Sequence, residues 1–261
     1  MNESTLYLIL AAIFGQGIFL LIALRFIPKR NKQANRILSI LLIIANFMIL
    51  GRIIVGYYGM HEVFKVGTLA DASIFLFGPL LYCYTRRLLF LETPAFRLNW
   101  MHYVPVLVYL IYFGWTLELS LTIAIEQYRL GLLSLLFMII EGLGIISMSF
   151  YIVRSFFLLK SYKDQKEELA ESQRRTSRFL RILLITLSVF IGFWLMNFIN
   201  EYILLDSFKF ISYTAMWISI GGLIYVIGFY SLIRPEIFQT QKSNEKISIK
   251  HQHRLSAREI E

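Results

Sequence analysis

Seven stretches of the chain are apolar for about 20 residues each, and short polar segments separate them. Because an α-helix rises about 1.5 Å per residue, about 20 apolar residues cross the roughly 30 Å hydrocarbon core of a bilayer. The pattern therefore predicts an all-α, polytopic membrane protein, a bundle of seven transmembrane helices. The expected spans are residues 5–27, 37–58, 68–89, 100–119, 130–153, 180–203 and 210–233.

The polar segments predict how the rest of the chain is organised. Residues 1–233 are expected to form the transmembrane domain, and residues 234–261 a basic, linker-like cytoplasmic tail that is disordered or partly helical. The longest internal connection, about 154–179, is charged and rich in helix-forming residues. We expect it to extend its two flanking helices into the cytoplasm, either as a solvated segment or as a signal-coupling or dimer-contact element.

Lysine and arginine are distributed unevenly between the connections. Of the 26 Lys and Arg residues, 22 follow the first, third, fifth and seventh spans, three lie in the other connections, and Arg52 lies inside a span. Cytoplasmic loops of membrane proteins carry such an excess of Lys and Arg. We therefore expect the N-terminus outside and the C-terminus in the cytoplasm.

Composition supports the membrane interpretation. The chain is 57% hydrophobic and 16% charged, against about 25% charged in an ordinary soluble domain. Its mean hydropathy is +0.62. The single cysteine, Cys83, excludes an intrachain disulfide. The net charge of +9 is first a topology signal in a membrane protein, not a sign of nucleic-acid binding.

Ionisable and amide side chains inside the spans are the candidate ligand-binding residues, because polar groups at membrane depth are costly and mark functional sites. Arg52 and Asp71 are expected in the outer third of the bilayer, and Glu141 near its midplane. Asn197, Asn200 and Glu201 lie at the outer end of the sixth span, with i,i+3 and i,i+4 spacing that puts them on one helix face. Several helices thus bring polarity to the outer half of the bundle.

Three interpretations of this polar group stay open. Arg52 could form an interhelical ion pair with Asp71 or Glu141 that fixes the packing of the helices. The residues could instead line a ligand pocket that opens outward, or form part of a proton pathway. Gly78-Pro79 in the third span and Pro105 in the fourth are expected to kink their helices.

The chain shows no motif of catalytic chemistry. None of its four histidines has metal-ligand spacing to another ligand within a span, there is no G-x-S-x-G nucleophile motif, and the seventh span has no lysine for a retinal Schiff base. We expect no enzymatic activity, no catalytic residue, no metal and no cofactor.

Three motifs carry a resemblance to a known family. They read IFLFGPLLYCYTRRLL at 74–89, WMHYVPVLVYLIYF at 100–113 and YVIGFYSLIRPEIF at 225–238. In this order they resemble the N-terminal multi-helix membrane region of membrane-bound AraC/XylS-type transcription regulators of the Bacteroidota. In that group a cytoplasmic linker and a paired helix-turn-helix DNA-binding domain follow, and this sequence stops at Glu261 before any such domain.

The resemblance implies a sensory, signal-transducing module in the bacterial inner (cytoplasmic) membrane. A signal would leave through the seventh span, with Gly228, Arg234 and Pro235 as its exit. The expected partners are the lipid bilayer, an unknown extracytoplasmic or membrane ligand, a second copy in a homodimer, and DNA only through a domain absent from this chain. The chain is then either the membrane half of a longer protein or a relative that lost its DNA reader.

Other function classes compete with the sensor. A small membrane transporter or channel would use Arg52, Asp71 and Glu141 along its path, although the sequence shows no internal repeat of the kind common in transporters. A lipid-modifying membrane enzyme and a purely structural subunit are further alternatives.

Overall fold

The computed structural model describes residues 3–27, 31–58, 68–90, 99–164, 171–205, 208 and 213–238. Within these residues every regular element is helical, which confirms the all-α prediction. The elements are α1 (Glu3–Phe26), α2 (Lys32–Tyr58), η1 (Leu69–Ser73), α4 (Ile74–Leu89), η2 (Trp100–Tyr103), α5 (Val104–Glu118), α6 (Leu121–Arg129), α7 (Leu132–Asp164), α8 (Glu171–Phe198), η3 (Ile199–Ile203), α9 (Tyr213–Ile233) and η4 (Pro235–Phe238).

Six helical segments of the described chain are long and apolar enough to cross a membrane. They are Ser4–Phe26, Lys32–Tyr57, Trp100–Glu118, Leu132–Asp164, Glu171–Ile203 and Tyr213–Ile233. The expected span at 68–89 is not among them; there the 3₁₀ segment Leu69–Ser73 precedes α4, which has 16 residues, or about 24 Å. The six-helix count is what length and composition support, and the seventh crossing stays a prediction.

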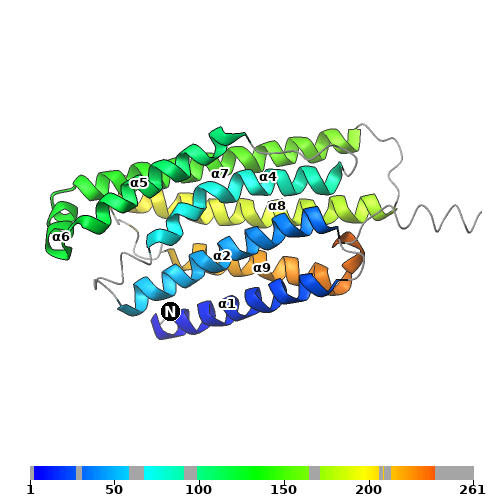
Figure 1. Cartoon of the computed structure of the whole chain (residues 1–261), viewed down its shortest axis with the longest axis horizontal. Coiled ribbons are helices and arrows are strands. Elements are labelled where there is room, and N and C mark those ends of the chain that lie inside the picture. Colours follow the sequence, from blue (N-terminus) through cyan, green and yellow to red (C-terminus); the bar gives the residue numbers. More distant parts are fainter. Residues whose placement is uncertain are drawn as a thin grey trace, which may run out of the picture.

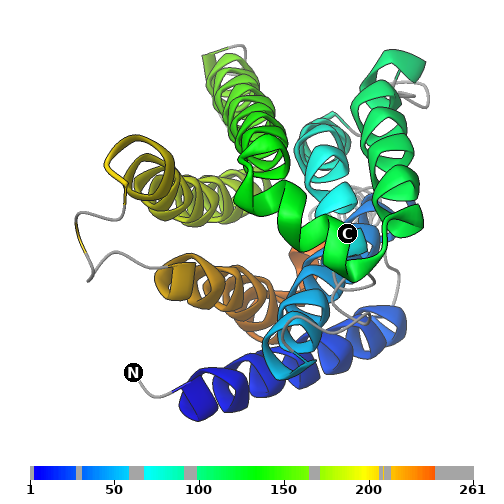
Figure 2. The ribbon, with the colours of Figure 1, turned by 90° about the vertical axis from the view of Figure 1, so that its left-hand side faces the viewer.

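Six helices form a closed ring of neighbours around the core. Each of the pairs α1–α2, α2–α4, α4–α7, α7–α8, α8–α9 and α9–α1 is in contact. The long helices run side by side in Figure 1, and Figure 2 looks along the bundle from the end that holds α6. Helix α5 stands outside this ring and packs mainly on η1, so α4, with 16 residues, belongs to the ring and α5, with 15, does not.

The two helices also differ in burial. Ten of the 16 residues of α4 are buried, whereas only Tyr109 and Phe113 are buried in α5. Large apolar side chains point outward on α5 and elsewhere, such as Ile111 (75% exposed) and Phe157 (65% exposed). Such an apolar exterior suits a hydrocarbon surrounding, as the composition predicts.

Helices α7 and α8 continue beyond the length that a bilayer requires. Helix α7 has 33 residues, about 50 Å, and ends at Asp164, and α8 begins at Glu171. This confirms the predicted helical extension on both sides of the connection. Residues 165–170 between them, and the tail from residue 239 on, lie outside the described residues.

The three expected kink residues have different surroundings. Pro79 lies inside α4, as expected, one turn after the 3₁₀ segment η1. Gly78 marks a close approach of two helices, since a Cβ there would lie 2.7 Å from Cδ2 of Tyr151 on α7. Pro105 lies in the first turn of α5, where a proline is tolerated because its missing N–H has no intrahelical partner. The expected kink inside the fourth span is therefore replaced by a helix start.

Candidate functional site

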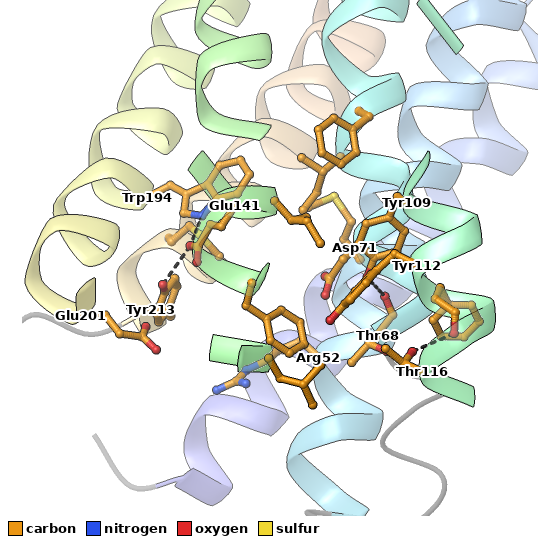
Figure 3. A pocket seen from close by; sticks show the side chains of 18 of the residues that line it. Arg52, Thr68, Asp71, Tyr109, Tyr112, Thr116, Glu141, Trp194, Glu201 and Tyr213 are labelled. Carbon is orange, nitrogen blue, oxygen red and sulfur yellow. Dashed lines mark hydrogen bonds between the residues drawn. The ribbon is translucent and has the colours of Figure 1, made fainter. Parts of the chain in front are cut away.

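A cavity of about 590 Å³ opens between the helix ends at the α6 side of the bundle. Its walls come from the end of α2, η1, the starts of α4, α7 and α9, the ends of α5 and α8, and α6 (Figure 3). It brings together Arg52, Asp71 and Glu141, three of the five residues predicted to bind a ligand. These come from three separate elements, so only the tertiary packing unites them.

Glu141 is the best-connected carboxylate of the cavity. Its Oε1 accepts hydrogen bonds from the indole Nε1–H of Trp194, at 2.5 Å, and from the hydroxyl of Tyr213, at 2.8 Å. The three residues belong to α7, α8 and α9 respectively. Both donors are neutral, so the two hydrogen bonds satisfy the carboxylate without a counter-charge and tie the three helices together beside the cavity (Figure 3).

Arg52 faces an aromatic ring and not an acid. Its guanidinium carbon lies 5.9 Å from the ring centre of Trp217, a cation–π geometry. Its Nε is buried and has no hydrogen-bond partner in the described part of the chain. Among the described residues no carboxylate oxygen lies within the 4.0 Å of an ion pair from Arg52, so the expected direct pairing with Asp71 or Glu141 is not formed.

Asp71 lies on the 3₁₀ segment η1, beside aromatic side chains of α5. Tyr109 and Tyr112 both line the cavity with it, their ring centres 5.8 Å apart. The Tyr109 hydroxyl donates to the backbone oxygen of Thr68, at 2.8 Å, whereas the Tyr112 hydroxyl is buried and finds no partner among the described residues. This hydrogen bond holds α5 against η1 next to the carboxylate.

The two predicted asparagines have structural contacts and do not line the cavity. Asn197 Nδ2 donates to the backbone oxygen of Phe193, and Asn200 Oδ1 accepts from the backbone N–H of Phe208, at 3.1 Å. Glu201, which the sequence placed on the same face as the two asparagines, does line the cavity. It lies in the π-helical turn η3 that follows α8, together with Asn200.

Aromatic side chains form much of the cavity wall, and none of them was among the predicted ligand-binding residues. They include Tyr109, Tyr112, Trp194, Tyr202, Tyr213 and Trp217. The available signal was the residue type, because a Tyr hydroxyl or a Trp N–H inside an apolar span needs a polar partner. Tyr213 and Trp194 find theirs on Glu141.

The predicted exit from the last span ends in a docked turn at the opposite end of the bundle. Helix α9 ends at Ile233, and Pro235 begins η4, whose residues Pro235–Phe238 we call the exit anchor. The Phe238 side chain is 0% exposed and packs edge-on against Phe179 of α8. The segment after Pro235 is thus held within the bundle.

Polar contacts hold the exit anchor to α2 and α8. The backbone oxygen of Phe238 accepts from the N–H of Asn31, at 2.8 Å, and from Nδ2 of Asn35, at 2.9 Å. The Glu236 carboxylate accepts from Arg175 at 2.9 Å and lies 3.9 Å from Arg234. Gly228, the third exit residue, lies within continuous α9, where an added Cβ would meet no atom closer than 3.8 Å.

No group of three or more His, Cys, Asp or Glu side chains in the described part of the chain is placed to hold a metal ion. Comparisons with known protein families, with curated proteins and with solved structures found no match to this chain.

Proposed function

We propose that the chain is the transmembrane sensory module of an AraC-type, membrane-tethered transcription regulator. The observation that carries the proposal is that one set of helices builds both functional ends. Helices α2, α8 and α9 contribute Arg52, Trp194 and Tyr213 to the cavity. The same three helices hold the exit anchor at the other end.

The proposed orientation places the cavity outside and the exit anchor in the cytoplasm of a bacterial cell. In this topology η1 and α4 together make the third of seven crossings, and the membrane is the inner membrane. The distribution of charge supports it, because Arg86 and Arg87 lie in the last turn of α4 and Arg234 follows α9 at the anchor side.

The mechanism requires two arrangements of the bundle that bind the ligand unequally. A ligand that draws the walls of the cavity together would shift α9 relative to α2 and α8. Because the exit anchor is packed on α2 and α8, that shift changes the position of the chain after residue 238. A DNA-binding domain outside this chain, or a second copy in a homodimer, would respond to the new position.

The experiment is a transcription reporter fused after Glu261 of the full chain. Phe238→Ala loosens the exit anchor and Glu141→Gln weakens the cavity wall, so each should change reporter output several-fold. Phe157→Ala and Glu126→Gln are matched controls, since both residues are exposed. If the inserted, folded Phe238 and Glu141 variants leave the output unchanged, the sensor proposal is wrong.

The grouping of Arg52, Asp71 and Glu141 also supports a second candidate, a small membrane transporter or channel. A transporter exposes its site to each side of the membrane in turn. Asp71→Cys in a Cys83→Ala background separates the two functions with a membrane-impermeant thiol reagent. A sensor should be labelled from the outer side only, and a transporter from both sides.

A further inference from the structure

Acidic side chains outnumber basic ones in the described lining of the cavity. Its described lining contains three carboxyl groups, Asp71, Glu141 and Glu201, and a single cationic side chain, Arg52. The guanidinium of Arg52 already faces the Trp217 ring. A ligand that complements this lining therefore carries positive charge, because a carboxylate in an apolar surrounding is stabilised by a cation.

The Asp71 carboxyl group has no donor among the described residues. Glu141 accepts two hydrogen bonds from the protein, whereas the Asp71 side chain forms no hydrogen bond or ion pair with any described residue. It nevertheless lies at membrane depth in the proposed topology, where an unpartnered carboxylate is costly. A donor supplied by the ligand would remove that cost.

The walls beside Asp71 are aromatic and suited to a cation with an apolar body. Phe75, Tyr109 and Phe113 belong to a small apolar cluster of their own, apart from the main core, and all three line the cavity. Tyr112 packs edge-on against Phe137 on the same wall, with ring centres 6.2 Å apart. Aromatic faces attract cations, and organic ammonium groups are recognised in this way.

We propose that the cavity binds an organic amine, with its ammonium group at Asp71 and its apolar body against the Tyr109 and Tyr112 rings. This inference rests on the proposed function, since it names the ligand class of the sensor's cavity. The volume of about 590 Å³ lies within the range of small-molecule sites, roughly 300–1,000 Å³.

Three probes with one apolar body and different charge test the ligand class. They are 4-phenylbutylamine, 4-phenylbutyrate and 4-phenylbutanol. Binding to the full chain in detergent micelles is followed by quenching of tryptophan fluorescence, because Trp194 and Trp217 line the cavity. We expect the amine to bind at least tenfold more tightly than the alcohol, and the carboxylate to bind most weakly.

Variants distinguish binding at Asp71 from partitioning of the amine into micelles. Asp71→Asn should weaken amine binding at least tenfold and leave alcohol binding unchanged. Glu126→Gln removes the same charge from an exposed position on α6 and should leave both unchanged. Equal amine binding by the Asp71→Asn variant, or preference for the carboxylate, overturns the proposal. Either result leaves the reporter experiment untouched, so the sensor function stands or falls separately.

Discussion

The two ends of the α2, α8 and α9 group are built in different ways. At the cavity end these helices stand around about 590 Å³ of space, where Arg52 Nε and the Tyr112 hydroxyl have no hydrogen-bond partner within the described segments. At the anchor end they close on Phe238, which is 0% exposed and whose backbone oxygen accepts two hydrogen bonds. The space and the polar atoms of the cavity end allow a bound ligand to move its walls. The anchor end is packed around Phe238, so the exit anchor moves together with the helices that hold it.

The largest loss of stability is expected at the exit anchor, where it tests how tightly Phe238 is packed. Phe238→Ala should lower the free energy of unfolding by about 3–5 kcal/mol, because it removes a fully buried ring and leaves a cavity. Denaturation in mixed micelles measures the change. Phe157→Ala, at a 65% exposed position, is the control and should cost far less. Equal losses would show that the anchor is loosely packed.

The second prediction concerns the close contact between α4 and α7, which lies between the two ends. Gly78→Ala should destabilise the fold by about 1–3 kcal/mol, since the new Cβ would lie 2.7 Å from Cδ2 of Tyr151 and 3.3 Å from its Cβ. Gly228→Ala is matched to it, because its Cβ would meet Gln16 at an ordinary 3.8 Å. A larger loss of stability for the Gly228 variant would contradict the close contact between α4 and α7 at Gly78.

The third prediction concerns the hydrogen bond between Tyr213 and Glu141 in the cavity wall. Tyr213→Phe removes one donor to Glu141 and should cost about 1 kcal/mol. A double-mutant cycle with Glu141→Gln gives the coupling energy of this pair. Tyr225→Phe on the same helix, where the side chain is 60% exposed, should change stability little and should not couple to Glu141. Absence of coupling for Tyr213 would mean that the hydrogen bond does not hold α9 to α7.

The smallest effect is expected for the ion pair at the anchor. Glu236→Gln should cost about 0.5 kcal/mol, since both side chains of its pair with Arg175 are about one-third exposed and water weakens their attraction. The loss should shrink further at high salt, which screens exposed charges. A loss above that of Tyr213→Phe would show that charge, and not the packing of Phe238, holds the anchor in place.

The apolar spans could be predicted from the sequence because each is long and self-contained in its hydrogen bonding. The depth of Arg52 and Asp71 within those spans indicated that they lie toward one end of the bundle, and Glu141 was expected near the midplane; the structure places all three around one cavity. The spacing of Asn197, Asn200 and Glu201 predicted a shared face, of which only Glu201 lines the cavity. The two asparagine side chains hydrogen-bond backbone groups, which their spacing does not reveal.

Inward and outward faces were decided only by the tertiary structure. In a membrane protein the side that meets lipid is as apolar as the core, so periodicity does not reveal which face is buried. For this reason the sequence could not tell that α4 is enclosed by its neighbours and α5 is not. The aromatic wall around Asp71 and the burial of Phe238 likewise depend on helices far apart in the chain. The sequence by itself determined where the helices lie and how far along each helix its ionisable side chains stand. The packing of the helices decided which of those side chains share a cavity.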